Sequence, residues 1–432
     1  MHAVSQRLDE ATLLADLKDR AFAPSSGPVQ VGLEVEMLAL RENRAVPLVE
    51  LVDALEPLFN LGELVDITSP GGLTTYTYGP IKLTFEPGGQ LEIVSPPRSS
   101  VDQALDDVQR LELLLQRVLP WRGIRLAGYG LNPWQTEDEI ELQTPLPRYL
   151  AMDRYFSGLG KDGQRMMRLS CALQINVDTG SGSEAEERWR LANLMSPVLA
   201  GMFANSPLMG GQRTEWKSRR SLVWRGVDPT RTGCLLAPSG PEAYLDFALG
   251  AGLLLRRTPQ GYRPGHSGYT FGQWLSDGDD LGYPELDDWR YHLTTLFPQV
   301  RPRGSLELRS IDTPPGQWRS VPVAIATALL VDGVARERSI ACLEPYASNL
   351  DELAVASARY GPAHPLVGAL SCELLGFALE SFDRLPRDFI SSAVVSDVQR
   401  FVDRYTARGR CPADDPLDVD PVPRDGVAAD PV

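Results

Sequence analysis

The stretch Leu83–Pro97, LTFEPGGQLEIVSPP, predicts a β-hairpin that carries two carboxylates on one face. If Pro87–Gly89 forms a three-residue turn, Thr84 pairs with Glu92, and Glu86 stands beside the turn on the same face. The other face would be apolar, with Leu83, Phe85, Leu91 and Ile93. A face bearing carboxylates invites a hard cation, although one isolated hairpin by itself favours an ordinary solvated outer face.

Three further segments alternate in the same way, which strengthens the cation interpretation. Apolar residues from Val31 to Met37 alternate with glutamates, the segment Met167–Asp178 is apolar on one side only, and Leu306 and Leu308 alternate with charged residues. The sequence therefore predicts several strands with one polar face, which would carry Glu34, Glu36, Glu86, Glu92, Arg168, Gln174, Asn176, Glu307 and Arg309.

The segments between these strands read as helices, so we predict an α+β fold with a largely antiparallel sheet. One face of the sheet would form a polar active-site trough, and helices would cover the other face. The expected helices include Asp9–Phe22, Val101–Leu119 and Glu184–Ala204, followed by a helical layer over Val321–Arg404. No repeat or long linker divides the chain, so residues 1–410 are expected to form a single catalytic domain. Residues 411–432 are expected to be a disordered acidic tail.

The composition excludes several classes of function. The 432 residues carry a net charge of -15, which argues against a protein that binds nucleic acid by neutralising phosphates. The five cysteines form no CxxC pair, and the four histidines form no HExxH motif, so an oxygen-rich Mg²⁺ site is favoured over a zinc site. No apolar run is long enough to span a bilayer, and the N-terminus does not resemble an export signal. We therefore expect a cytoplasmic protein.

Positive charge is concentrated in one segment, QRTEWKSRRSLVWRGVDPTRTG, which contains Arg220, Trp224 and Arg231. Such a run is often a solvated surface, but in an acidic protein it also predicts an anion site, because arginine forks bind phosphate oxygens. The chain has no GxxxxGK[ST] phosphate loop and no complete dinucleotide fingerprint, so a doubly wound nucleotide fold is not expected.

A series of motifs, in order along Val29–Leu385, resembles the glutamate-cysteine ligases of the plant and bacterial type, within the carboxylate-amine ligases. The motifs are GLEVE, FEPGGQLEIVSPP, MMRLSCALQINVD, ANSP, RSLVW, RTG, HLTTLFPQVR and LELRS. The segment Ser310–Gln317, SIDTPPGQ, departs from the glycine-rich stretch of the plant enzymes. Together with the scarcity of lysine, this departure indicates the actinobacterial enzymes that supply γ-glutamylcysteine for ergothioneine synthesis.

The resemblance implies a glutamine-synthetase-like fold and ATP-dependent ligation of L-glutamate to L-cysteine through a γ-glutamyl phosphate. It implies that two or three Mg²⁺ ions are held by Glu34, Glu36, Glu86, Glu92 and Glu307. Arg309, Arg220 and Arg231 would be catalytic, and Arg168, Gln174, Asn176 and Trp224 would bind substrate. No nucleic acid, membrane or obligate protein partner is expected. Two alternatives stay open, namely a ligase for a different amine and an inactive nucleotide-binding regulatory module.

Overall fold

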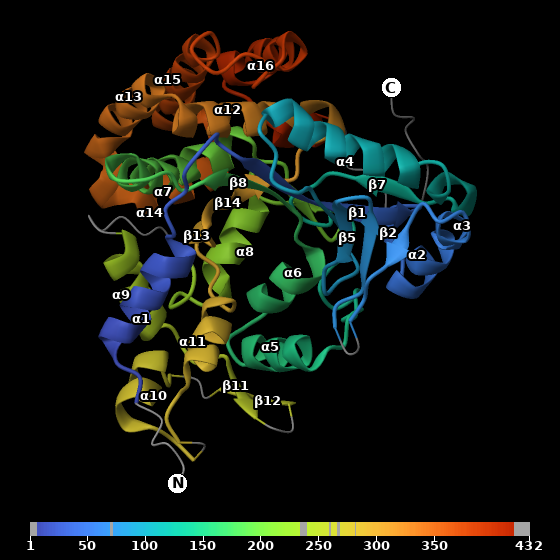
Figure 1. The fold of residues 1–432 in the computed structure, drawn as a ribbon. Coiled ribbons are helices and arrows are strands. Elements are labelled where there is room, and N and C mark those ends of the chain that lie inside the picture. Colours follow the sequence, from blue (N-terminus) through green and yellow to red (C-terminus); the bar gives the residue numbers. More distant parts are fainter. Residues whose placement is uncertain are drawn as a thin grey trace.

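A ten-stranded antiparallel sheet organises the chain in the computed structural model (Figure 1). The structure describes residues 7–69, 72–233, 240–258, 261–265, 268–280 and 282–418. The strand order is β13-β14-β8-β1-β6-β5-β4-β3, and β2 and β7 pair with β1. The strands are β1 (Val31–Arg41), β2 (Arg44–Ala45), β3 (Val65–Asp66), β4 (Thr75–Tyr78), β5 (Ile81–Phe85), β6 (Leu91–Val94), β7 (Arg125–Ala127), β8 (Ala172–Asp178), β13 (Val300–Pro302) and β14 (Ser305–Asp312). The predicted antiparallel sheet is confirmed.

The β5–β6 hairpin has the predicted register. Thr84 lies opposite Glu92, and the Glu86 backbone N–H donates to the Gln90 carbonyl at 2.8 Å. The turn requires glycine for two reasons. Gly89 has a φ of +86°, and a Cβ on Gly88 would lie 2.3 Å from the backbone oxygen of Arg168. The turn is therefore packed tightly against another segment of the chain, which holds the neighbouring Glu86 in place.

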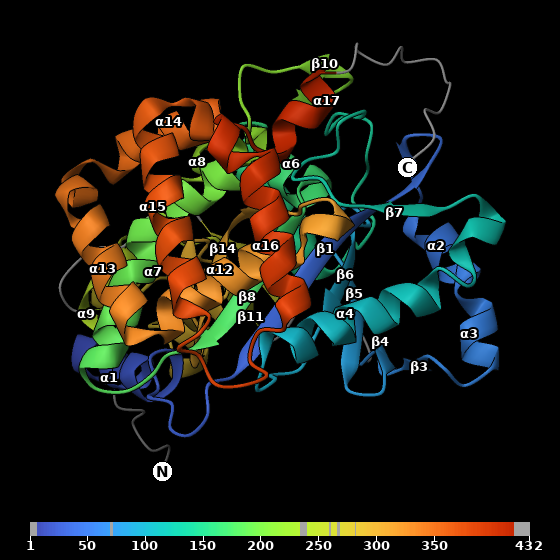
Figure 2. The same cartoon turned by 90° about the horizontal axis from the view of Figure 1, so that it is seen from above.

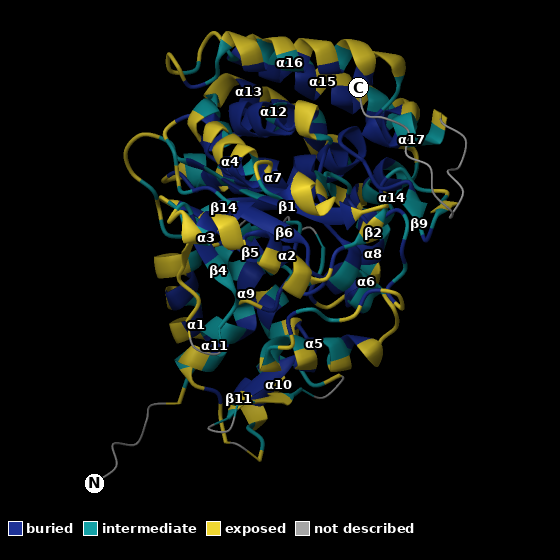
Figure 3. Cartoon of the chain, turned by 90° about the vertical axis from the view of Figure 1, so that its right-hand side faces the viewer, coloured by how far each residue is buried: buried dark blue, intermediate teal, exposed yellow. Residues whose placement is uncertain are grey.

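Helices cover the apolar face of the sheet, as expected. Helices α4 (Val101–Leu115), α7 (Ser183–Met202) and α12 (Ser320–Val331) pack against the strands. A second helical layer lies outside them, and Figure 2, which views the molecule from above, shows α15 and α16 in front of α12. Its members are α13 (Gly333–Leu343), α14 (Leu350–Tyr360), α15 (Pro365–Ser381) and α16 (Ser392–Arg404). The main core lies between sheet and helices, where the ribbon is buried in Figure 3. Leu33, Val35 and Ile175 in this core are fully buried.

The polar face is also flanked by structure. Helices α5 (Pro147–Ser157), α6 (Asp162–Leu169) and α8 (Arg219–Val227) lie below the sheet in Figure 1 and share a separate hydrophobic cluster around Phe156, Met167 and Trp224. Figure 1 also shows α11 (Leu286–Leu293) on this side, near the N-terminal segments α1 (Glu10–Asp16) and η1 (Leu17–Ala21). Four other helices are α2 (Leu48–Ala54), α3 (Glu56–Asn60), α9 (Gly240–Gly250) and α10 (Phe271–Asp277). Two small hairpins lie outside the main sheet, namely β9 (Leu208–Met209) with β10 (Gln212–Arg213) and β11 (Leu255–Thr258) with β12 (Gly261–Pro264). The predicted polar face therefore lies between two hydrophobic clusters.

One predicted strand boundary is wrong. The strand expected from Met167 begins at Ala172, and helix α6 continues to Leu169, so Arg168 lies on a helix. The sequence is ambiguous here because Met166, Met167 and Leu169 are all buried, which suits a helix packed on the second cluster as well as it suits a strand. Tertiary packing against α5 and α8 decides for the helix.

The first part of the expected disordered tail is ordered. Residues 412–418 form the short elements η7 (Pro412–Asp414) and α17 (Asp415–Asp418). Cys411 and Ala413 are fully buried against Ala204, the Ala413 N–H donates to the Ala204 carbonyl at 2.8 Å, and Asp414 pairs with Lys217. Small side chains can fill a narrow site that composition alone does not reveal. Residues 419–432 lie outside the described part of the chain.

In the described ranges no single helix is long and apolar enough to cross a membrane. The segments Gly316–Val331 and Gly333–Ala363 meet that test only as a pair, across a bend of 96°. Residues 321–330 of α12, within the first segment, are buried in the protein.

Candidate active site

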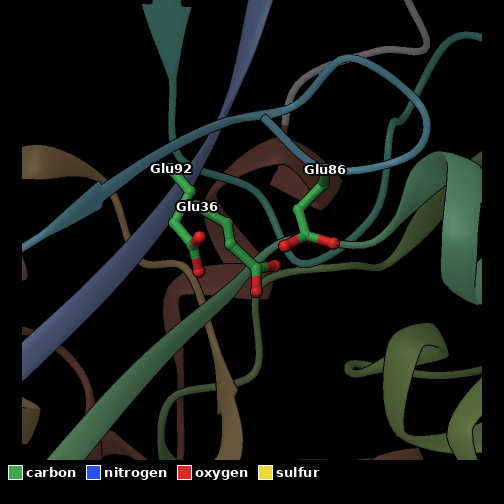
Figure 4. Close-up of side chains that lie close together, drawn as sticks. All are labelled: Glu36, Glu86 and Glu92. Atoms are coloured by element: carbon green, nitrogen blue, oxygen red, sulfur yellow. The ribbon is translucent and has the colours of Figure 1, made fainter. Parts of the chain in front are cut away.

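Three glutamates meet on the polar face of the sheet (Figure 4). Glu36 on β1 lies opposite Glu92 on β6, and Glu86 follows β5 at the hairpin turn. One carboxylate oxygen from each residue lies within 4.8 Å of the others. The sequence predicted that these residues share a face, and the structure brings them close enough to share one ion.

Crowding and burial make this cluster electrostatically unfavourable without a cation. Burial, and after it the charge of the neighbouring Glu36, raises the pKa of Glu92 to about 7. The pKa of Glu86 is raised well above its usual value by burial and then by Glu92. Burial also raises the pKa of Glu36, although the Arg220 guanidinium opposes that shift. A bound divalent cation would replace this repulsion with attraction.

Hydrogen bonds fix the orientation of the cluster. The Ala172 N–H and the Gln174 side-chain amide each donate to a Glu36 oxygen at 2.8 Å, and the Thr84 hydroxyl donates to Glu92 at 2.5 Å. The Gln174 side-chain oxygen is buried without a hydrogen-bond partner among the described residues. The donors to a cation would all be oxygens, which suits Mg²⁺. The residues present therefore fit such an ion.

Glu34 and Asn176 extend the polar face toward β14. The Asn176 amide donates to Glu34 at 3.4 Å and its oxygen accepts from the Ser305 hydroxyl at 3.2 Å. Burial raises the pKa of Glu34 to about 7, with smaller contributions from the Glu307 and Glu92 charges. The charge of Glu34 is therefore influenced both by the three-glutamate cluster, through Glu92, and by Glu307.

Glu307 does not join that cluster in the described residues, because three arginines enclose it. Its carboxylate accepts from Arg301 at 2.6 and 3.1 Å, from Arg303 at 2.8 Å and from Arg309 at 2.8 Å. Its side chain is fully buried, which would raise the pKa, but the three guanidinium groups outweigh burial and hold the pKa below its usual value. Arg303 also lies 3.7 Å from Glu34, so it links the two acidic regions.

Arg220, Arg309 and Trp224 form a second predicted group that the structure brings together. The guanidinium carbons lie 4.9 and 5.5 Å from the Trp224 ring centroid, and Arg220 donates to the Arg309 carbonyl at 2.9 Å. The Trp224 indole N–H donates to the Phe297 carbonyl at 2.8 Å, which fixes the ring. Two cations are thereby held against one aromatic ring, next to the glutamates whose pKa values they influence.

Sequence reasoning missed Asp312, which holds Arg220 in place. This fully buried carboxylate accepts from the Asn205 N–H at 2.8 Å and from the hydroxyls of Ser206 at 2.7 Å and Ser218 at 3.1 Å, and it lies 3.7 Å from Arg220. The ANSP motif contains Asn205 and Ser206, and the SIDTPPGQ segment contains Asp312, but the two segments are about a hundred residues apart in sequence. Tyr149 on α5 was also missed; burial and the Glu86 charge raise its pKa.

The structure places Arg231 and Arg168 away from the predicted roles. Arg231 is fully buried and donates to Asp228 at 2.8 Å, to the Thr295 carbonyl at 2.9 Å and to the Gly252 carbonyl. Arg168 donates to Asp153 at 2.6 Å and to the Glu137 carbonyl at 3.0 Å. The guanidinium groups of both arginines thus bind other parts of the protein. A residue that clamps a phosphate or anchors a substrate would instead need a guanidinium group that faces the ligand. Within the predicted basic run, Arg220 and Trp224 are the residues that reach the site.

Comparison with known proteins agrees with this geometry. The model of the glutamate-cysteine ligase family 2 (GCS2) matches residues 30–429. The chain belongs to this family. It is 34% identical over 344 residues to the glutamate-cysteine ligase EgtA of Mycobacterium tuberculosis, covering 77% of this chain and 76% of that protein. It is 30% identical over 316 residues to the chloroplastic glutamate-cysteine ligase of Medicago truncatula, covering 70% of this chain and 60% of that protein.

Among solved structures, a glutamate-cysteine ligase from Francisella tularensis in complex with AMP has a TM-score of 0.54 at 12% identity. The match covers 91% of this chain and 85% of that chain. At this identity the likeness concerns the fold, and it confirms the predicted glutamine-synthetase-like class. The family assignment confirms the resemblance found in the sequence motifs.

Proposed function

We propose that this protein ligates the γ-carboxylate of L-glutamate to the amine of L-cysteine, using ATP and forming a γ-glutamyl phosphate, to give γ-glutamylcysteine, ADP and phosphate. The observation that carries the proposal is the group of three closely spaced glutamates on one sheet face in a chain of this family. An unactivated carboxylate needs phosphoryl transfer before it can form an amide, and phosphoryl transfer needs neutralised charge.

Glu36, Glu86 and Glu92 are proposed to hold Mg²⁺, with Glu34 and Glu307 completing a site for two or three ions. When bound, Mg²⁺ would neutralise the negative charge that gathers on phosphate and carboxylate oxygens. Glu307 would then exchange part of its contact with the three arginines for contact with a cation. The nearby Glu34 and its raised pKa support placing a further cation between Glu34 and Glu307.

The residues around the glutamates would bind and orient the substrates. Arg220 and Arg309 supply fixed positive charge beside the cluster, and Trp224 holds both guanidinium groups. Gln174 and Asn176 can orient a substrate by hydrogen bonds without adding charge. Arg231 and Arg168 become positioning residues in this proposal, because their guanidinium groups connect segments of the protein.

We further propose that the chain acts as a single catalytic domain in the cytoplasm and supplies γ-glutamylcysteine for ergothioneine or a related thiol. The sequence similarity to the mycobacterial protein named EgtA supports this pathway. The free cysteines among the described residues, Cys171, Cys342, Cys372 and Cys411, are compatible with a reducing compartment. No obligate protein partner is part of the proposal.

The test is an ATP-dependent product assay by mass spectrometry, with L-glutamate and a panel of amino acids as amine donors. We expect γ-glutamylcysteine and stoichiometric phosphate release with cysteine and Mg²⁺. Preferential use of another amine would identify a different carboxylate-amine ligase. Absence of any product with every donor, together with intact ATP binding, would indicate a regulatory module. The Glu86→Gln variant is the matched control, since it removes one carboxylate charge with little change in shape.

A further inference from the structure

A cavity of about 410 Å³ lies between helices α7, α8 and α14. Residues of α9 and of the segments at β13 and β14 complete its lining. Among the described residues, Trp224 is the one lining residue that we also place in the candidate active site. The cavity therefore adjoins that site without being part of it, and the proposed ligase function assigns it no ligand.

Much of the cavity wall is apolar, but it contains one buried hydroxyl that lacks a partner. The apolar side chains include Pro197, Ala200, Trp224 and Phe247. Ser310 is 2% exposed, and its hydroxyl has no hydrogen-bond partner among the described residues. The pairing of β14 with β8 shifts between Leu308 and Ile311, and a bulge of this kind re-aims the side chain that it contains. Because an unpaired buried hydroxyl is unfavourable, a ligand group that bonds to Ser310 would gain affinity.

The exposed part of the lining carries an ion pair. Arg225 on α8 and Asp351 on α14 lie 3.0 Å apart, and their side chains are 38% and 83% exposed. A pair this exposed contributes little to stability, so each group is able to exchange its partner for a ligand. The ammonium and the carboxylate of one zwitterion would satisfy both charges at once. A free α-amino acid carries these two charges on groups attached to the same carbon.

We propose that this cavity binds a free α-amino acid whose side chain is largely apolar and ends in one hydrogen-bonding group, and that its occupancy acts on the reaction through Trp224. The carboxylate would bind Arg225 and the ammonium Asp351, which leaves the side chain to enter the apolar part and to reach Ser310. A second ionised group in the apolar part would lose its hydration, so L-glutamate is a poor match. The site is thereby distinct from that of the glutamate substrate.

Trp224 links the cavity to the arginines of the candidate active site. The guanidinium carbons of Arg220 and Arg309 lie 4.9 and 5.5 Å from its ring centroid. Ser310, in the cavity wall, directly follows Arg309 in the chain. A ligand that packs against Trp224 would restrain the ring, and with it the two guanidinium groups beside the glutamates, so the bound amino acid should activate the enzyme. This coupling rests on the proposed ligase function, whereas binding in the cavity does not.

Ligand-detected NMR titrations with L-tyrosine and L-phenylalanine test the site, since the two probes differ by one hydroxyl. L-Tyrosine should bind about three- to tenfold more tightly, because its hydroxyl pairs with Ser310. In Ser310→Ala the two affinities should become equal, and the free protein should be at least as stable, since an unpaired buried hydroxyl is removed. Tyramine, which is L-tyrosine without the carboxylate, should bind about tenfold more weakly than L-tyrosine.

Arg225→Gln should weaken L-tyrosine about tenfold, because the partner of its carboxylate is lost, and should leave tyramine binding unchanged. Arg359→Gln is the matched control, since that arginine on α14 is 40% exposed, pairs with Glu215 and lies outside the cavity lining. Thermal unfolding checks the fold of each variant. No detectable binding of either amino acid, or equal binding to Arg225→Gln and the parent, would overturn the site. Competition by saturating L-cysteine or L-glutamate would also overturn it, by placing the probe among the substrates.

Steady-state kinetics test the coupling. Saturating L-tyrosine should raise kcat about fivefold, which is the lower end of the usual coupling between two sites. Arg225→Gln should respond only at about tenfold higher concentrations of L-tyrosine. Bound L-tyrosine with an unchanged kcat would overturn the action through Trp224. Normal ligation without any L-tyrosine binding would contradict the cavity site alone, whereas L-tyrosine binding without ligation of any donor would contradict only the ligase function.

Discussion

Glu92 and Glu307 are the same residue type on the same face of one sheet, yet their surroundings are opposite. Glu92 shares its site with two other carboxylates, and burial and repulsion raise its pKa to about 7. Glu307 lies among three guanidinium groups that hold its pKa below the usual value. The difference shows that the polar face has two electrostatic halves. One half gathers carboxylates, which suit a cation, and the other adds guanidinium groups, which suit an anion, to the carboxylate of Glu307.

The cation half is tested most strongly by Glu86→Gln and Glu92→Gln. Each should lower kcat roughly 10³-fold, because several kcal/mol of transition-state charge stabilisation would be lost with the metal ligand. The metal-free variants should be at least as stable as the parent, since repulsion within the cluster is relieved. Product formation and thermal unfolding measure the two effects. An unchanged kcat at saturating Mg²⁺ would show that these residues are not metal ligands.

The other half should respond in the opposite way. Glu307→Gln leaves Arg301 and Arg309 buried without a counter-charge, which should lower the free energy of unfolding by about 3–5 kcal/mol. Arg303→Gln is the matched control, because its side chain is 53% exposed and the ion pair should contribute only about 0–1 kcal/mol. Urea denaturation of both variants gives the comparison. Equal losses of unfolding free energy in the two variants would contradict the view that burial makes the loss of the Glu307 charge more costly.

Asp312 connects the two halves by holding Arg220, which faces Glu36. Asp312→Asn should lower kcat about tenfold with a smaller change in the KM for glutamate, because Arg220 would lose its fixed position. Glu215→Gln is the control, since that carboxylate is 78% exposed and also pairs with an arginine. If Asp312→Asn lowered the thermal stability but kept a normal kcat at temperatures where the variant is folded, Asp312 would have only a structural role.

The smallest expected effect concerns pH. The carboxyl of Glu92 has a pKa of about 7 in the folded chain against 4.5 for the free side chain, so folding favours its protonated form between these values. The metal-free protein should therefore lose stability as pH rises from about 4.5 to about 7. Mg²⁺ needs the deprotonated form, so the Tm gain on adding it should be a few degrees larger at about pH 8 than at about pH 6. Glu92→Gln should reduce that difference. A Tm gain independent of pH would contradict the coupling.

The sequence by itself determined which residues share a face. The period of two along Val31–Met37 and Leu83–Ile93 places the glutamates together because side chains alternate in any extended strand. The Pro87–Gly89 turn sets the hairpin register for a similar local reason. The ordered series of motifs also identified the family, which agrees with the match over residues 30–429.

Only the tertiary structure decided which of those residues meet and what each one contacts. Glu307 and Glu92 follow the same pattern in sequence, but Arg301 on β13 and Arg303 in the β13–β14 connection contact Glu307, whereas Glu92 lies among carboxylates. Arg231 and Arg220 lie in one basic run, yet Arg231 donates to the distant carbonyls of Thr295 and Gly252, whereas Asp312 orients Arg220. Helix α6 and the docked residues 411–418 likewise depend on distant partners. The local alternation of residues fixes the direction in which each side chain points. The charges around a side chain and its burial depend on segments that approach only when the chain is folded.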